Sequence, residues 1–308
     1  MAEAENGRTS EMTTERARVI EAYRALMDEK GWSLKEGAKP VKIAPSTLSQ
    51  VLAGTYKGRL GAICHRMSGV LHRERRRRAA PRRPGFKRTS VAETVLAACD
   101  DAHALRIPVL ITGQSGCGRT EALKAYAETN PETIHVVCGP HSLPRSILLE
   151  IADQVGIEVK RGGIHALRTA LEKELFGSDR LLIVDEIDYV PESVLQSLRI
   201  LADEADIGVV YCGTRAFLSN LRRRKSETVN QFLNRVAYVE DCAPLTDEDL
   251  DLLMEDAQLD EPARQVAREN ARGCARRMVN GIQLASRETR GSVGARDLHQ
   301  AFRRLLAV

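Results

Sequence analysis

The stretch IPVLITGQSGCGRT, residues 107–120, decides how this chain folds. Its first part, residues 107–112, is a short apolar run that predicts a buried strand. The glycine-rich segment that follows opens a helix expected over 119–128, which is the setting that the P-loop pattern requires. Backbone amides in such a turn, and the positive end of the helix dipole, converge on phosphate oxygens. The stretch therefore predicts a phosphate-binding loop between a strand and a helix.

One position of this loop departs from the P-loop pattern. Arg119 stands where a lysine is expected, and its planar guanidinium differs from an ammonium in reach and hydrogen-bond geometry. Arginine can still contact phosphate, so we expect the substitution to affect hydrolysis of the nucleotide more than its binding. Taken alone, the segment could also be a chance glycine-rich turn. The candidate nucleotide-binding residues are Gly113, Gln114, Ser115, Gly116, Cys117, Gly118, Arg119 and Thr120, of which Thr120 would place its hydroxyl on Mg²⁺.

A second element, RLLIVDEIDYV at residues 180–190, supports the first. It is an apolar strand that ends in two neighbouring carboxylates. An acid at the end of such a strand can hold Mg²⁺ through water, and its neighbour can polarise an attacking water. Asp185 is the candidate metal ligand and Glu186 the candidate general base. Either acid alone could be a solvated strand end, but the two elements together predict an ATP-binding site.

Apolar strands and helical segments alternate around these two elements. Strands are expected at 134–139, 181–188, 207–213 and 237–241, with helices at 144–155, 164–175 and 192–205. Buried strands separated by helices indicate an α/β domain, a parallel sheet with helices on both faces. After Pro244 the pattern is helical only and begins with the capping-box sequence TDED, residues 246–249, which predicts a helical lid.

The N-terminal part has the pattern of an all-α helix-turn-helix domain. Apolar residues recur at helical spacing from Thr13 to Lys30, and a short helix is expected over Thr47–Leu52, closed by Gly54. Short polar groups at the exposed start of that second helix suit base edges or phosphates. A small helical interaction module that touches no DNA is the alternative. The candidate DNA contacts here are Ser46, Thr47, Ser49 and Gln50.

A basic segment follows the helix-turn-helix pattern. Residues 71–90 contain nine Arg or Lys and one Glu, together with two prolines and a glycine, which is typical of a linker. Such a segment could be merely solvated. Beside a helix-turn-helix it favours contact with a phosphate backbone, with affinity that falls steeply as salt rises. Because basic residues outnumber base-reading ones, we expect weak sequence preference.

Composition excludes several other classes of protein. The chain has 308 residues and a net charge of +4, with 43% hydrophobic and 29% charged residues, as in soluble globular proteins. Aromatic residues make up only 4%, which disfavours base-stacking platforms for single strands. The seven cysteines form no C-x-x-C pair, and the histidines suggest no catalytic triad. No apolar run approaches the ~20 residues that span a bilayer, so a cytoplasmic location is expected.

The order of these motifs resembles the AAA+ superfamily, specifically the transposition ATPases of the phage Mu B and TniB type. In such proteins a polar residue after the next strand senses the γ-phosphate, and Thr214 in VVYCGTR fits, although it could merely cap the next helix. A trans-acting arginine precedes the last strand, which implies Arg235, with Arg222, Arg223 and Arg224 as competitors. The lid arginine of a GxxR motif would be Arg276 in GCARR, or else Arg277.

The resemblance extends to the N-terminal region. The stretch STLSQVLAGTYKG, residues 46–58, is similar to the N-terminal module of Mu B proteins, where a leucine-containing helix precedes a G-x-Y-x-G turn. This similarity adds Tyr56 and Lys57 to the candidate DNA contacts. The patterns along the chain together predict four parts: a helix-turn-helix domain at 1–70, a basic linker at 71–92, a AAA+ domain at 93–243 and a helical lid at 244–308.

The resemblance implies a function for the whole chain. Expected is an ATPase that uses ATP and Mg²⁺, oligomerises on duplex DNA as a ring or helical filament, and delivers target DNA to a DDE-type transposase that it activates. No membrane partner is expected. Two alternatives stay open: a helicase loader or replication initiator of the same superfamily, and a DNA regulator or scaffold that binds ATP with little hydrolysis, for which Arg119 is the supporting feature.

Overall fold

The computed structural model describes residues 2–79, 84–157, 163–289 and 292–305. The chain divides into two compact units, Met1–Pro81 and Arg82–Val308, and each is considered by itself. In the described part of the chain, no helix is both long enough and apolar enough to cross a membrane.

Helices make up the described part of the first unit. Their apolar faces meet in one core, in which Tyr23, Leu48 and Met67 are fully buried. The Tyr23 hydroxyl donates to the Gly37 carbonyl at 2.8 Å, so the largest core side chain is also satisfied as a donor. The helices are α1 (Ala2–Lys30), α2 (Leu34–Val41), α3 (Pro45–Leu52) and α4 (Leu60–Ala79).

This unit differs from the sequence-based expectation in three places. The first helix begins at Ala2, earlier than Thr13. Helix α2 was not expected, because it is short and contains Gly37 and Pro40, but a Ser33–Glu36 capping box begins it. Helix α4 continues to Ala79, so the first part of the proposed linker at 71–92 is helical. The first part of that helix packs on the core through Ile63, Met67 and Val70, which are buried and recur at helical spacing.

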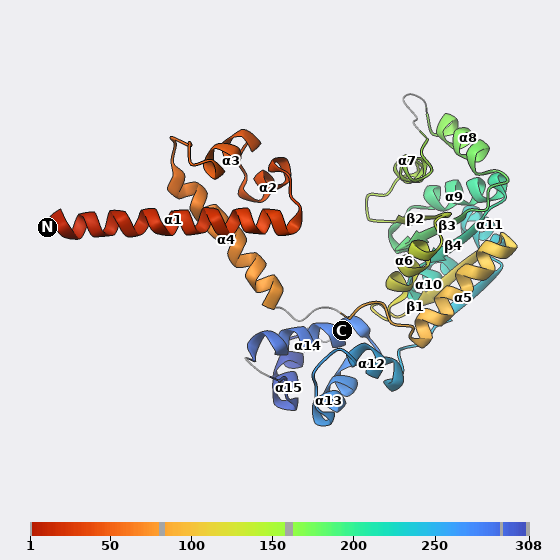
Figure 1. The fold of residues 1–308 in the computed structure, drawn as a ribbon. Coiled ribbons are helices and arrows are strands. Elements are labelled where there is room, and N and C mark those ends of the chain that lie inside the picture. Colours follow the sequence, from red (N-terminus) through yellow and green to blue (C-terminus); the bar gives the residue numbers. More distant parts are fainter. Residues whose placement is uncertain (1, 80–83, 158–162, 290–291, 306–308) are drawn as a thin grey trace. The chain divides into compact units, whose positions relative to one another are not determined.

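The second unit is built on a sheet of five parallel strands in the order β2-β3-β4-β1-β5 (Figure 1). Four strands lie within two residues of the runs expected for them, and β3 begins as expected but ends three residues early, at Asp185; the α/β assignment is confirmed. Parallel pairing brings the carboxyl ends of all five strands to one edge, where loops can build a site. The strands are β1 (Pro108–Gly113), β2 (Thr133–Val137), β3 (Leu181–Asp185), β4 (Gly208–Cys212) and β5 (Tyr238–Cys242).

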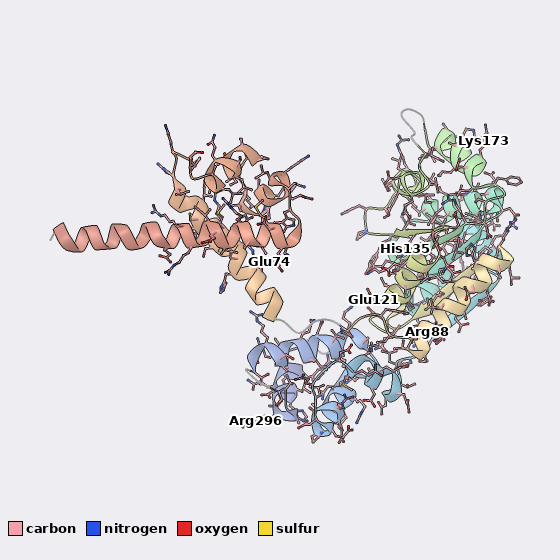
Figure 2. The ribbon with its side chains drawn as sticks, viewed as in Figure 1. Glu74, Arg88, Glu121, His135, Lys173 and Arg296 are labelled. Carbon is pink, nitrogen blue, oxygen red and sulfur yellow. The ribbon has the colours of Figure 1, made fainter. Side chains whose placement is uncertain are left out.

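Helices cover both faces of the sheet (Figure 1). Val109 and Ile111 of β1 pack on the face covered by α5 (Ser90–Leu105) and α6 (Arg119–Thr129), whereas Leu110 packs on the opposite face. This alternation is what a strand buried on both sides produces. Figure 2 shows His135 of β2 beside α6. The opposite face is covered by α7 (Pro144–Gln154), α8 (Ile164–Leu175), α9 (Glu192–Ala205), α10 (Arg215–Arg223) and α11 (Glu227–Arg235).

A helical lid follows β5 and shares the core of the α5–α6 face. The expected capping box is present. The Thr246 hydroxyl accepts the Asp249 amide, and the Asp249 carboxylate accepts the Thr246 amide at 3.0 Å. Asp249 also accepts the Ser90 amide at 2.6 Å and the Ser90 hydroxyl at 2.5 Å, which fastens the lid to the start of α5. The lid helices are α12 (Asp247–Met254), α13 (Glu261–Ala271), α14 (Ala275–Glu288) and α15 (Ala295–Arg304).

Candidate nucleotide site

The glycine-rich loop has the backbone that a phosphate site needs. It joins β1 to α6, and Gly116 and Gly118 adopt φ angles of +82° and +110°, a region that costs glycine little and other residues much. At Gly113 an added Cβ would lie 2.5 Å from Arg119 Nη1 and 3.0 Å from Cys242 Cβ. The three glycines are therefore required by conformation or by close packing.

Arg119 is held inside this loop. Its side chain is buried, and Nη1 donates to the Gln114 carbonyl at 2.9 Å and to Cys117 Sγ at 3.3 Å. Among the described residues, its Nε is buried with no hydrogen-bond partner. A buried cation whose partners are a carbonyl and a weakly accepting thiol lacks a counter-charge, which an anion at the loop can supply.

The two carboxylates of the DEID segment differ in environment. Asp185 is the last residue of β3 and only 2% exposed; its Oδ1 accepts the Glu186 amide at 2.8 Å. Its Oδ2 is buried with no partner in the part of the chain that the structure describes. Glu186 is exposed and has a φ of +54°, a strained conformation that recurs at functional sites. One acid is thus buried with a free oxygen, and the other faces solvent.

The thiol of Cys212 is influenced by both Asp185 and Arg119. Cys212 ends β4, between β3 and β1, and the charges of both residues act on its thiol. Burial, and next the charge of Asp185, raise the pKa of this thiol well above its usual range. The thiol is therefore neutral, so it leaves the charges of the P-loop arginine and of the β3 carboxylate uncompensated.

These residues fit Mg²⁺ with a nucleotide. The unpartnered Asp185 oxygen and the Thr120 hydroxyl, in the first turn of α6, are hard oxygen donors. Among the described residues, no group of three or more His, Cys, Asp or Glu side chains could hold a metal ion by itself. Mg²⁺ commonly binds one or two protein groups together with substrate phosphates, so the donor set matches that mode.

The lid contacts the P-loop directly. The Arg276 amide donates to the Gly116 carbonyl at 3.2 Å, and Cys274 Sγ lies 3.6 Å from the Ser115 carbonyl oxygen. The Arg276 side chain is exposed, whereas Arg277 Nε donates to the Asn270 carbonyl at 2.7 Å within the lid. Of the two candidates, Arg276 is thus the one brought to the loop.

Thr214 caps helix α10. Its hydroxyl accepts the Phe217 amide at 3.2 Å and donates to Asp188, which also accepts the Thr214 amide at 3.0 Å. The capping alternative is therefore what the structure contains, and a role in sensing phosphate stays a prediction. The sequence analysis did not single out Asp188, although this acid lies two residues after Glu186 in the segment DEID.

Two of the candidate trans-acting arginines, Arg235 and Arg224, lie beside acids of α9. Arg235 ends α11 with a side chain 60% exposed, and its Nε is 3.5 Å from Asp203 Oδ2. Arg224 forms an ion pair with Glu192 at 3.3 Å, and Arg223 bonds within its own helix. Arg235 is thus weakly held and exposed, as a residue for a second subunit must be, but its role stays a prediction.

The candidate DNA contacts lie on or just after α3 in the first unit. Ser46, Ser49 and Gln50 are exposed, as is Lys57, and Thr47 is half-buried. Tyr56 packs against the core of this unit, and an added Cβ at Gly58 would lie 2.4 Å from its hydroxyl. The tyrosine and glycine of the G-x-Y-x-G turn therefore fit each other. Tyr56 has a packing role, and the exposed residues remain the candidates for DNA.

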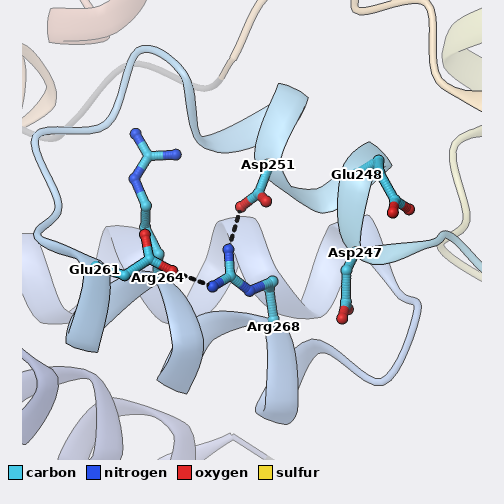
Figure 3. Close-up of a pocket in the computed structure, with 6 residues that line it drawn as sticks. All are labelled: Asp247, Glu248, Asp251, Glu261, Arg264 and Arg268. Atoms are coloured by element: carbon cyan, nitrogen blue, oxygen red, sulfur yellow. Dashed lines mark hydrogen bonds and ion pairs between the residues drawn. The ribbon is translucent and has the colours of Figure 1, made fainter.

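A separate hollow of about 530 Å³ lies on the lid (Figure 3). It contains none of the residues 113–120, 185 or 186. Arg268 at its centre donates to Asp251 at 2.6 Å and to Glu261, so its charge is already compensated. The lining residues are Asp247, Glu248, Asp251, Glu261, Arg264 and Arg268. The P-loop, where buried polar atoms lack partners, is therefore the better candidate for a nucleotide site.

Comparison with known proteins agrees with this geometry. Residues 106–221 match the family model described as "AAA domain". The DNA transposition protein B of the Mu-like prophage FluMu from Haemophilus influenzae is 28% identical over 178 residues, 57% of this chain and 62% of that protein. The ATP-dependent target DNA activator B of Escherichia phage Mu is 25% identical over 199 residues, 64% of each chain.

The alignments thus span slightly less than two thirds of these relatives. Among solved structures, domain III of the Thermotoga maritima replication initiation protein DnaA gives a TM-score of 0.49 at 17% identity, covering 69% of this chain and 90% of that one. Residues 106–221 thus resemble a AAA domain, and about 60% of the chain is similar to phage transposition proteins named B.

Proposed function

We propose that this protein is an ATPase that assembles on duplex DNA with little sequence preference and presents that DNA to a DDE-type transposase, which it activates. The observation that carries the proposal is the pair of incompletely satisfied buried groups at one sheet edge, Arg119 and Asp185. The relatives named "ATP-dependent target DNA activator B" support the DNA and transposase parts.

In the proposed nucleotide complex, loop amides and the start of α6 bind the phosphates, with Gly116 and Gly118 allowing close approach. Thr120 and Asp185 would hold Mg²⁺, which neutralises phosphate charge when bound. Glu186, the exposed acid, orients the attacking water and accepts its proton. Arg276, presented by α14 at the loop, would contact the phosphates from the lid.

Assembly would complete the site. Arg235 is exposed and lies on the α9 side of the sheet, paired loosely with Asp203. In the proposal it reaches the nucleotide of a neighbouring copy, which makes a monomer a poor ATPase. Contacts of this head-to-tail kind build a ring if they close and a helical filament if they do not.

DNA binding is assigned to the first unit and the basic segment. The exposed polar residues of α3 and Lys57 would contact DNA, and Arg or Lys residues of 71–90 would neutralise phosphates. The side chains of residues 75–83, which include six of the nine Arg or Lys, lie outside the described part of the segment. Phosphate contacts dominate this set, so binding should be broad in sequence and sensitive to salt.

A second candidate is a nucleotide-responsive regulator with little turnover. The observation that favours it is Arg119 Nη1, which is bound to the Gln114 carbonyl and to Cys117 within the loop. Replacing Arg119 by lysine separates the two candidates. A large rise in turnover would favour the regulator, and equal turnover would favour the ATPase.

The deciding experiment is fluorescence anisotropy of labelled duplex DNA with the full chain and ATP, ADP or no nucleotide, at low and moderate salt. The proposal expects ATP alone to tighten binding and salt to weaken it. The matched control is Asp185→Asn, which should lose the ATP effect and keep the nucleotide-free affinity. Affinity that ignores nucleotide in the unaltered protein would contradict the coupling of ATP to DNA. Added transposase should then be stimulated, whereas stimulation of a helicase would indicate a loader.

A further inference from the structure

The first two residues at the start of helix α10 reach to opposite sides of β4. Thr214 donates to Asp188, in the turn after β3, by both its amide and its hydroxyl. Arg215 donates toward the end of β5. Because β4 lies between β3 and β1, and β5 lies beyond β1, these neighbouring residues span most of the sheet edge that carries the P-loop.

Arg215 makes three hydrogen bonds at the end of β5. Its Nε donates to Asp241 Oδ1 at 2.7 Å and Oδ2 at 3.0 Å, and its Nη2 donates to the Cys242 carbonyl at 2.9 Å. Asp241 Oδ1 also accepts the hydroxyl of Thr112, next to the P-loop, at 2.9 Å. The Arg215 bond lowers the pKa of Asp241, as expected for a charged pair. Arg215 therefore ties α10 to β5 and, through Asp241, to the P-loop strand.

The end of β5 is also where the lid begins. An added Cβ at Gly113 would lie 3.1 Å from the Cys242 carbonyl oxygen, so that residue is packed against the P-loop. Three residues later, the Leu245 amide donates to the Gly273 carbonyl at 3.1 Å. The next lid residue, Cys274, is the one whose thiol lies against the Ser115 carbonyl. The position of 242–245 thus fixes the lid residues that touch the loop.

We propose that Arg215 is a positioning residue that holds lid residues 273–276 against the P-loop, through Asp241 and the Cys242 carbonyl. The nucleotide part of this inference rests on the proposed function, and the lid contact does not. A guanidinium suits the task because its planar fork can bond a carboxylate and a carbonyl together. A lysine has one charged nitrogen and would keep only part of the connection.

The native cysteines provide a probe of the lid contact. Six of the seven are buried, and Cys274 is the partly exposed one. An aromatic disulfide reagent such as DTNB should therefore modify Cys274 first, at a rate that rises when the lid leaves the loop. Cys274→Ser identifies the reacting thiol by removing that phase.

The test compares Arg215→Gln with Arg106→Gln, both in the full chain without nucleotide. Arg106 forms an ion pair with Asp206 at 3.1 Å with side-chain exposures of 42% and 62%, close to the 47% and 52% of Arg215 and Asp241, but before β1 and β4 begin. We expect Arg215→Gln to raise the Cys274 rate roughly three- to tenfold, as loss of an ordinary hydrogen bond at a half-exposed pair predicts. Arg215→Lys should fall between, and Arg106→Gln should match the unaltered protein.

Two results would overturn the inference: an unchanged Cys274 rate in Arg215→Gln, or an equal increase in Arg106→Gln, which would mean general loosening. With ATP present, Arg215→Gln should raise KM for ATP more than it lowers kcat, since the lid contributes binding. A protein that binds no ATP would refute the proposed function, while the nucleotide-free rates would still decide the role of Arg215.

Discussion

Two arginines of the second unit, Arg268 partly exposed and Arg119 buried, differ in how their charge is compensated. Arg268 lies in the lid hollow between Asp251 and Glu261, and both carboxylates accept bonds from its guanidinium (Figure 3). Arg119 lies in the P-loop with a carbonyl and a thiol as partners, and its Nε has none among the described residues. The hollow on the lid thus belongs to the arginine whose charge is already compensated.

The difference teaches where a ligand can gain binding energy. A buried polar group without a partner costs about 1–3 kcal/mol, and a ligand that satisfies it recovers part of that cost. Asp185 Oδ2, like Arg119 Nε, is buried without a partner among the described residues. The carboxylate oxygen suits a cation, and the guanidinium nitrogen suits an anion. A Mg²⁺–nucleotide complex supplies both charges, whereas the lid hollow offers carboxylates that are already paired.

The largest expected effect lies with the acid beside this pair. Glu186→Gln should lower ATP turnover about 100- to 10,000-fold, because a general base contributes that much, and should leave nucleotide affinity nearly unchanged. Glu261→Gln in the lid hollow is the matched control and should turn over normally. Phosphate release and nucleotide titration measure the two quantities. Normal turnover in Glu186→Gln would remove the general-base assignment.

The next effect tests the two arginines directly. Arg119→Ala should weaken ATP binding by about 10- to 100-fold, as loss of charged hydrogen bonds to phosphate predicts. Arg268→Ala should bind ATP within about twofold of the unaltered protein, because its partners are carboxylates of the lid. Titration with a fluorescent ATP analogue measures both. Equal losses of ATP affinity in the two variants would mean that the contrast between Arg119 and Arg268 is wrong.

A smaller effect separates a buried lid carboxylate from the exposed ones. Asp249 is 4% exposed and accepts bonds from Ser90 and Thr246, so Asp249→Ala should destabilise the protein by about 1–3 kcal/mol. Arg268→Ala breaks a more exposed pair and should cost ~0–1 kcal/mol. Urea unfolding measures both. A larger loss in Arg268→Ala would show that the lid hollow is structural.

The smallest effect concerns acidity. Burial would raise the pKa of Asp249, but hydrogen bonds from Ser90 and Thr246 outweigh it and lower the pKa. A lowered folded pKa gives stability that is present above the unfolded value, about 3.9, and is lost as pH falls through the folded value. The stability difference between the unaltered protein and Asp249→Asn should therefore be constant from about pH 7 to 5 and shrink below about pH 4. A constant difference down to about pH 2 would contradict this origin.

The sequence predicted the strands well because parallel strands buried on both faces are short apolar runs with clear ends. It missed α2, whose Gly37 and Pro40 disfavour a helix that capping and burial then stabilise. It also left Thr214 open between sensing and capping, because the deciding partner, Asp188, lies 26 residues away. It also left the two lid arginines open, because the contacts of Arg276 with Gly116 and of Arg277 with Asn270 come from the folded structure.

By itself, the sequence determined the P-loop, the paired acids after β3 and the capping box of the lid, since each is a pattern within a few residues. Only the tertiary structure decided the strand order β2-β3-β4-β1-β5, the bond of Asp249 to Ser90, and the contact of Cys274 with the loop at Ser115. Local patterns follow from backbone geometry and neighbouring side chains. Contacts between residues 159 positions apart depend on how whole faces pack, which no short stretch of sequence encodes.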